Sequence, residues 1–255
     1  MKLDVVKKLN LLNQNFYTEI GQYFNHTRNY SWEGWDKLLE NIKLIMEEND
    51  LDVLDLGCGN ARFLEFLLKQ EFITKSYFGL DNSDFLLEKA TEKVSHCNYN
   101  SFEFLKTDLL FEDWKLNNSQ RFSLITIFGV LHHIPSLELR LSFLEKAKEK
   151  LTKNGLIVFT TWNFARVERL KKRIVDLDSE IAQNLFQKIQ LEKIDLDSGD
   201  YILDWVKGQV SYRYSHYYSD SEVLELLKKT KLKLVEKFVA DGRESNVNTY
   251  YIVRQ

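Results

Sequence analysis

Cysteine and proline are scarce in this sequence of 255 residues, and its first segment lacks a continuous hydrophobic run. Two cysteines, Cys58 and Cys97, are too few for a disulfide framework and lack the paired spacing of a zinc site, so we expect no bound metal. Pro135 is the only proline, which leaves room for many uninterrupted helices and strands. Residues 1–15 alternate charged and apolar side chains. The sequence therefore predicts neither a signal peptide nor a membrane span, and it favours the cytoplasm.

An excess of charge of one sign is also lacking, because the formal net charge is only −3. That value gives no chain-wide signal for nucleic-acid binding, although a local basic face fits inside a near-neutral total. Hydrophobic residues make up 44% of the chain, enough to build a full core, so the composition predicts a folded protein.

Strands and helices alternate through the middle of the chain, which predicts right-handed βαβ units and a parallel sheet. The expected strands are residues 52–56, 77–80, 101–106, 122–128 and 156–162, and the expected helices are 61–69, a helix capped by Ser83, 137–151 with its C-cap at 153–155, and 219–229. Two last strands, 232–239 and 248–253, are expected to form a hairpin-like pair with one antiparallel strand near the C-terminus. The fold class is thus α/β, with a mostly parallel sheet.

Two segments add to this core within a single domain, 1–255. Apolar residues at helical spacing predict an amphipathic helix over 3–24, namely Leu9, Leu12, Phe16, Ile20 and Tyr23. With a second helix ending near residue 48, residues 1–48 are interpreted as an N-terminal helical lid. Residues 163–208 are highly charged and interrupt the alternation, so we interpret them as an inserted helical cap over the substrate side.

Residues 53–60, VLDLGCGN, end a predicted strand and open a helix, and they carry the strongest chemical signal. Glycines at 57 and 59 let the backbone pass close to a ligand at the carboxyl end of the strand, where open α/β sheets bind ligands. Nucleotide-binding dehydrogenases also use a G-x-G, but this loop lacks the third glycine of their fingerprint, which favours a phosphate-free adenosyl group. Asp81 ends the second strand and can accept both ribose hydroxyls, and Asp108 ends the third and can accept from the adenine amino group.

With these residues in this order, residues 50–162 resemble the class I S-adenosylmethionine (SAM) methyltransferases. The segment 127–133, IFGVLHH, also matches that family. The resemblance implies a Rossmann-like sheet, SAM as cofactor and an enzyme that transfers methyl groups. The expected cofactor site then comprises Arg28, Asp55, Gly57, Cys58, Gly59, Asn60, Asp81, Asn82, Asp108, Leu109, Phe128 and Val130.

Three further segments resemble the tRNA wobble-uridine carboxymethyl O-methyltransferases. Residues 23–32, YFNHTRNYSW, match that family's N-terminal signature, and residues 200–205, DYILDW, with 212–218, YRYSHYY, match its late signature. The resemblance implies O-methylation of a carboxylate on a modified tRNA wobble uridine, with tRNA as a partner and no membrane involvement. The family's eukaryotic members also work with a small zinc-binding activator protein, which is a second expected partner.

A carboxylate acceptor is ionised at neutral pH, so it needs groups that orient one oxygen and no general base. Arginine suits this task because its planar fork matches a carboxylate bidentately. The expected catalytic residues are Arg28, His133 and Arg213, with His216 as a further candidate. For Arg28 two roles stay open, binding the acceptor or binding the methionyl carboxylate of SAM. For Arg213 the two interpretations are binding the acceptor and forming a solvent-facing ion pair with an acid.

Two other functions stay open. One is methyl transfer to a small-molecule metabolite, favoured by the near-neutral charge and by a cap able to close over a small pocket. The other is a non-catalytic scaffold subunit with the SAM-binding fold, against which the acids at the expected adenosyl positions argue. Two interpretations also stay open for the basic runs at 169–173 and 228–233, which form either an RNA-facing patch or solvated helix faces.

Overall fold

The computed structural model describes residues 1–26, 30–46, 51–70, 74–95 and 101–255, so Cys97 lies outside the described residues. Its helices are α1 (Leu3–His26), α2 (Gly34–Ile45), α3 (Arg62–Lys69), α4 (Asp84–Val94), α5 (Leu137–Glu149), α6 (Glu168–Lys171), α7 (Glu180–Ile189) and α8 (Asp220–Thr230), with 3₁₀ turns η1 (Leu131–His133) and η2 (Lys193–Asp195). Its strands are β1 (Leu51–Leu56), β2 (Thr74–Asp81), β3 (Phe102–Lys106), β4 (Phe122–Ile127), β5 (Leu151–Trp162), β6 (Asp200–Trp205), β7 (Ser211–His216), β8 (Lys233–Ala240) and β9 (Asn248–Arg254).

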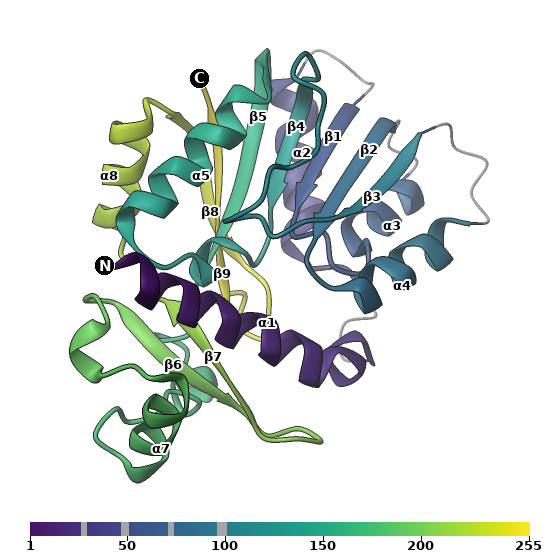
Figure 1. Cartoon of the computed structure of the whole chain (residues 1–255). Helices are drawn as coiled ribbons and strands as arrows, with labels where there is room; N and C mark the ends of the chain where they lie inside the picture. The colour runs from purple at the N-terminus through teal and green to yellow at the C-terminus, as the bar shows by residue number, and fades with distance from the viewer. Residues whose placement is uncertain (27–29, 47–50, 71–73, 96–100) are drawn as a thin grey trace.

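Seven strands form one sheet in the order β3-β2-β1-β4-β5-β9-β8 (Figure 1). The neighbours from β3 to β5 pair in parallel, whereas β9 pairs antiparallel with both β5 and β8. The predicted sheet, mostly parallel with one antiparallel strand near the C-terminus, is therefore confirmed. The strand order reverses between β1 and β4, and the carboxyl ends of the strands at such a point form the crevice in which open α/β sheets bind ligands.

Helices cover both faces of the sheet, so its central strands are buried on each side. Buried side chains of α5 and α8, including Phe143 and Leu226, pack on one face together with Ile125 of β4. The other face is covered by α2 and α3, whose Trp35 and Phe63 join a second core cluster. All six residues of β4 are buried, which explains its near-continuous apolar sequence.

The structure corrects the predicted boundary between α5 and β5. The helix ends at Glu149, and β5 begins at Leu151, because Leu151 pairs with Phe122 at the start of β4. Residues 152–155, predicted as part of a helix C-cap, instead form an irregularity before the regular pairing resumes at Leu156. The pairing of buried Leu151 with buried Phe122 thus outweighs the helix-ending signal of Gly155.

Residues 163–208 contain more than the helices that we predicted. They include α6, α7 and η2, but also β6, which pairs antiparallel with β7 as a separate two-stranded sheet. Ile202 of β6 and Tyr214 of β7 are fully buried and lie opposite each other in this pairing. Neither short strand alternates regularly between buried and exposed positions, so the period of two that marks a strand in a sequence is absent, which is why the hairpin was missed.

Helix α1 lies between the main sheet and this two-stranded sheet (Figure 1). Its apolar side chains Leu9 and Leu12 pack with Ile202, Tyr214 and residues of α7. The predicted apolar stripe of α1 is buried except at Tyr23, which is 46% exposed. Among the described residues, no helix combines the length and apolar content needed to cross a bilayer.

Candidate functional site

The glycine loop between β1 and α3 lies against the ends of β2 and β4. Gly57 has φ +81° and Gly59 has φ +54°, backbone conformations that side chains rarely adopt. A Cβ atom at Gly57 would also lie 2.2 Å from Cγ2 of Val130, just after β4. Glycine at 57 is therefore required both by the backbone and by the close approach of Val130, which brings the loop and the end of β4 together.

Asp81 at the end of β2 organises this loop. One carboxylate oxygen accepts from the backbone N–H of Gly59 at 2.9 Å, and the other accepts from the backbone N–H of Ser83 at 2.9 Å. Burial raises the pKa of Asp81, and the hydrogen bonds from Ser83 and Gly59 partly oppose that shift. The carboxylate is thus held beside the glycine loop, and its predicted contact with ribose hydroxyls stays a prediction.

Asp108, two residues after the end of β3 at Lys106, accepts hydrogen bonds on both of its carboxylate oxygens. One oxygen accepts from the backbone N–H groups of Leu110 and Phe111. The other accepts from the side-chain amides of Asn10 at 2.9 Å and Gln14 at 2.8 Å, both on α1. The carboxylate that was predicted to bind the adenine amino group therefore binds amide N–H donors of α1 in this structure.

Several of the predicted cofactor residues have roles inside the protein. Asp55 is buried in β1 and accepts hydrogen bonds from Tyr77 and, at 2.7 Å, from Thr126. Burial raises the pKa of Asp55 to about 6. Asn60 donates to the side-chain oxygen of Asn25, at the end of α1, at 2.7 Å. These contacts fix the loop and the helix around it.

The remaining predicted cofactor residues lie around the same loop and differ in how far their side chains are exposed to solvent. Asn82 is exposed, and Leu109 and Phe128 are half-buried. Cys58 is buried, and burial raises the pKa of its thiol well above the usual range, which agrees with a packing residue and not a reactive one. The ring of Phe128 packs against that of Phe63, 5.0 Å away between centroids.

His133 ends the turn η1 after β4 and is surrounded by α1 and β7. Its Nδ1 atom lies 3.0 Å from the backbone oxygen of Tyr214 and 3.3 Å from the amide nitrogen of Asn13. Its Nε2 atom lies 2.9 Å from the hydroxyl of Tyr17. Burial, together with the positive charge of Arg213, lowers the pKa of His133 to about 3, so the ring is neutral at physiological pH.

Arg213 on β7 is a buried cation, with 8% of its surface exposed. Its guanidinium lies 4.9 Å from the ring centroid of Phe16 and 4.7 Å from that of Trp162, within the range of cation–π contacts. It interacts with the hydroxyl of Tyr17, and burial lowers its pKa. Within the described part of the chain, no carboxylate forms an ion pair with Arg213, although the charge of Asp204, which pairs with Arg173, raises its pKa, and the Nε–H of Arg213 has no hydrogen-bond partner. The alternative of a solvent-facing ion pair for Arg213 is therefore wrong.

His216 belongs to a different cluster, which joins the two-stranded sheet to the core. Its ring lies between Asp200, 2.6 Å from Nδ1, and Glu222, 2.8 Å from Nε2. Arg140 of α5 contacts the same two carboxylates at 3.4 and 3.2 Å. The Tyr214 hydroxyl donates to Asp200 at 2.6 Å. With its ring occupied in this network, His216 holds the hairpin to α5 and α8.

The structure thus brings His133 and Arg213 together and separates His216 from them, while Arg28 lies outside the described residues. Sequence reasoning missed Tyr17, Asn10 and Gln14. These polar residues share one face of α1 at helical spacing, beside the apolar stripe and half-buried, and that pattern was a usable signal. No local pattern indicated which groups would lie across from that face.

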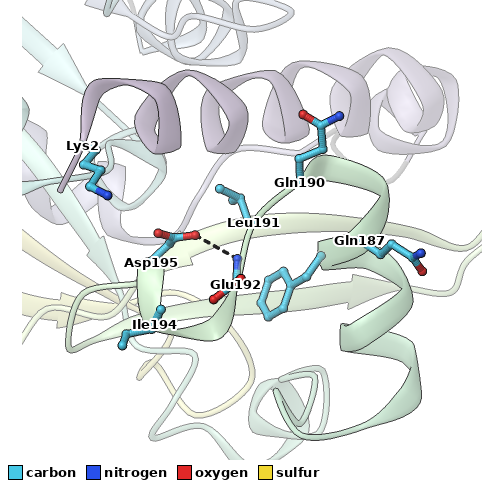
Figure 2. Close-up of a pocket in the computed structure, with 8 residues that line it drawn as sticks. Lys2, Gln187, Gln190, Leu191, Glu192, Ile194 and Asp195 are labelled. Carbon is cyan, nitrogen blue, oxygen red and sulfur yellow. Dashed lines mark hydrogen bonds between the residues drawn. The ribbon is translucent and has the colours of Figure 1, made fainter.

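A hollow of about 560 Å³ elsewhere on the surface is formed by η2, the end of α7 and the beginning of the chain (Figure 2). Lys2, Gln190 and Asp195 line it, and Asp195 accepts a hydrogen bond from the backbone N–H of Glu192 at 2.9 Å. None of the residues at the ends of β1, β2, β3 or β4 lines this hollow. It is therefore separate from the candidate site.

Comparisons with known proteins agree with this arrangement. A sequence-family model described as a methyltransferase domain matches residues 47–235, which is most of the chain. The ubiquinone biosynthesis O-methyltransferase of Rickettsia bellii is 25% identical over 202 residues, covering 78% of this chain and 69% of that protein.

Solved structures share the fold at low sequence identity. An S-adenosylmethionine-dependent methyltransferase from Clostridium acetobutylicum aligns with a TM-score of 0.65 and 15% identity, over 93% of this chain and 98% of that one. The CcbJ methyltransferase from Streptomyces caelestis aligns with a TM-score of 0.61 and 18% identity, over 88% and 90% of the two chains. With its family match, its sheet order and its glycine loop, the chain belongs to the class I SAM-dependent methyltransferases.

Proposed function

We propose that this enzyme transfers the methyl group of SAM to an oxygen of a carboxylate, which Arg213 holds. The observation that carries the proposal is the state of Arg213, which is buried and, among the described residues, has no carboxylate within ion-pair distance and no partner for its Nε–H; the charge of Asp204 acts on it from farther away. A buried charge is costly unless it is paired, so natural proteins seldom keep one without a use. A carboxylate acceptor would supply the missing charge when it binds.

The surroundings of Arg213 suit a planar anion. Phe16 and Trp162 contact the guanidinium through their rings and restrict its orientation, while the Nε–H edge stays without a protein partner. A carboxylate can take two parallel hydrogen bonds from such an edge. Lysine would provide the charge but not this paired geometry, and therefore we expect arginine to be specifically required.

The residues of the glycine loop fit the cofactor. Gly57 lets Val130 approach the loop where a Cβ atom would clash, and Asp81 presents a half-buried carboxylate beside Gly59. Asp81 would hold the ribose, and Asp108 the adenine amino group in place of one of the α1 amides. SAM supplies an electrophilic methyl group on a sulfonium. What remains for the protein is alignment in a pocket from which water is excluded.

Such a transfer needs no general base. A carboxylate is already ionised at neutral pH, and its oxygen forms the new bond to the methyl carbon as the carbon–sulfur bond breaks and leaves its electron pair on sulfur. No proton moves in this step. His133 is compatible with such a step, because a ring whose pKa is lowered to about 3 is too weak a base to take up a proton at physiological pH.

For the acceptor molecule we propose a tRNA carrying a carboxymethyl group on its wobble uridine. The support is the resemblance of residues 23–32 and 212–218 to enzymes of that class, the second of which contains Arg213. A second support is the basic run 169–173. It lies near the two-stranded sheet, because the backbone N–H of Val175, two residues further on, donates to the backbone oxygen of Ile202 in β6. The exposed cations of that run that are proposed to contact phosphates are Arg169, Lys171 and Lys172, whereas Arg173 pairs with Asp204. Arg28 is proposed to hold either the acceptor or the methionyl carboxylate of SAM.

A small-molecule acceptor is the second candidate. The net charge of −3 and the similarity to a ubiquinone biosynthesis O-methyltransferase favour it. The two candidates are separated by incubating the enzyme with methyl-labelled SAM and either total tRNA or a metabolite extract, followed by nucleoside analysis of the tRNA. We expect label in a carboxymethyl uridine. Label found only in small molecules would overturn the tRNA proposal.

A further inference from the structure

We infer that Tyr17 is a positioning residue of the acceptor site, and that His133 acts through Tyr17 and not as a base. The inference rests on the proposed carboxylate acceptor, since the group that Tyr17 positions is Arg213. Its geometric basis is that one hydroxyl of α1 contacts both the imidazole of the turn after β4 and the guanidinium of β7.

The neighbours of His133 determine which ring nitrogen carries the proton. The backbone N–H of Tyr214 donates to the side-chain oxygen of Asn13 at 2.8 Å, which orients the Asn13 amide so that its NH₂ group faces the imidazole. An NH₂ group cannot accept a hydrogen bond, so among the described residues the acceptor at Nδ1 is the backbone oxygen of Tyr214, 3.0 Å away. The proton therefore lies on Nδ1, and Nε2 has a free electron pair.

That assignment determines to which group the Tyr17 hydroxyl donates its hydrogen bond. Because Nε2 of His133 can only accept, the O–H of Tyr17 must donate to it across 2.9 Å. The electron pairs of the Tyr17 oxygen are then available to Arg213, whose guanidinium can only donate. A chain of hydrogen bonds thus runs from the backbone of Tyr214 through His133 and Tyr17 to the guanidinium.

The chain has a consequence for the acceptor. Tyr17 occupies one side of the guanidinium, and Phe16 and Trp162 contact it through their rings, which leaves the Nε–H side for a ligand. The position of the bound carboxylate is then set by the direction in which Tyr17 turns Arg213. Phe16 and Tyr17 are neighbours on α1, so this helix contributes both a ring and a hydroxyl to the orientation of one cation.

The test compares Tyr17→Phe with Tyr23→Phe, which removes an exposed hydroxyl from the same helix. The acceptor probe is 5-carboxymethyluridine, and the readouts are its KM and the SAM dissociation constant. We expect Tyr17→Phe to raise the acceptor KM about tenfold, the loss of one hydrogen bond near a charge, with the SAM dissociation constant changed less than about twofold. Tyr23→Phe should behave as wild type. An acceptor KM unchanged in a folded Tyr17→Phe protein would overturn the inference.

A second readout needs no acceptor. In ¹⁵N NMR of the imidazole, wild type should show the proton on Nδ1 of His133, and Tyr17→Phe should shift the Nε2 resonance while the proton stays on Nδ1. An unshifted Nε2 resonance, or a proton on Nε2 in wild type, would overturn the chain of hydrogen bonds. If the NMR result holds but wild type methylates no carboxylate, the proposed function has failed, and with it the role of Tyr17 toward the acceptor.

Discussion

The hydroxyl of Tyr17 lies 2.9 Å from Nε2 of His133, so the first helix of the chain is hydrogen-bonded to the turn that follows the central strand β4. Through Asn10, Gln14 and Asn25 the same helix also reaches Asp108 and Asn60. The helix therefore contacts both the expected adenosyl side and the expected acceptor side of the site.

The rate of methyl transfer should be flat from pH 6 to 9. Burial and the charge of Arg213 lower the pKa of His133 to about 3, so the ring stays neutral over this range. A carboxylate acceptor is ionised throughout the same range. Initial rates at constant ionic strength measure the profile. A rate that rises steeply up to pH 9 would indicate deprotonation of a hydroxyl or amine acceptor and contradict the proposal.

Replacing Asp81 should weaken SAM binding. Asp81→Ala removes the carboxylate that accepts from Gly59 and that we expect to bind the ribose, a loss of about 1–3 kcal/mol in binding free energy. Titration calorimetry with SAM gives the value. Asp84→Ala, three residues later and in an exposed ion pair with Lys106, serves as the matched control and should bind SAM as wild type does. If the two variants bind SAM with equal affinity, Asp81 does not contribute to SAM binding.

Asp55 should make the protein less stable as the pH rises from 4 to 7. Burial raises its folded-state pKa to about 6, above its unfolded value, so the folded state favours the protonated form. The stability from this group is present below pH 4 and is lost as the pH rises through 6, a change on the order of 3 kcal/mol. Asn does not titrate, so Asp55→Asn should gain stability relative to wild type between pH 4.5 and 7.5 in urea unfolding. The half-exposed Asp52→Asn on the same strand is the control, and an identical pH response of all three proteins would contradict this account.

The charged cluster behind the hairpin should be a major source of stability. Asp200→Asn leaves the buried guanidinium of Arg140 with Glu222 as its single acidic partner, and breaking a buried pair costs about 3–5 kcal/mol. Asp178→Asn breaks an exposed pair with Lys193 and should cost less than about 1 kcal/mol. Urea unfolding measures both. A loss from Asp200→Asn as small as that from Asp178→Asn would show that the cluster does not hold the hairpin.

Sequence alone predicted the parts of this structure that depend on local pattern. Alternating strands and helices gave the sheet, and the glycines at 57 and 59 with Asp81 located the loop that the structure places at the end of β1. Ser83 caps α4 as predicted, accepting from the backbone N–H of Leu86. Each of these features lies within one short stretch of chain, where residue type and spacing carry the information.

The acceptor side depends on contacts between distant segments, and there the sequence was less informative. Tyr17 and His133 are 116 residues apart, and no local pattern links them. Asp200 and His216 read as parts of a family signature, yet they serve a buried cluster whose third member, Arg140, lies in another helix. The side chains were recognisable as polar groups on helices and strands, but their partners were set by the packing of α1 and the hairpin.

Replacing Arg213 by lysine tests whether turnover depends on the planar geometry of the guanidinium or only on its positive charge. Arg213→Lys keeps the positive charge but loses the planar fork and its contacts with the rings of Phe16 and Trp162, so turnover should fall at least about tenfold. Arg254→Lys, at an exposed position at the far end of β9, is the control and should retain full activity. Steady-state assays with the same acceptor measure both variants. A fully active Arg213→Lys enzyme would mean that this arginine does not orient the acceptor.

The most direct measurement is the stability of the transferred methyl group to mild alkali. Product made with methyl-labelled SAM is treated with dilute base, and volatile label is collected. A methyl ester hydrolyses under these conditions and releases methanol, whereas a methyl ether or an N-methyl group does not. The proposed carboxylate acceptor predicts that nearly all of the label becomes volatile. Label that stays bound to the product after this treatment would contradict methylation of a carboxylate.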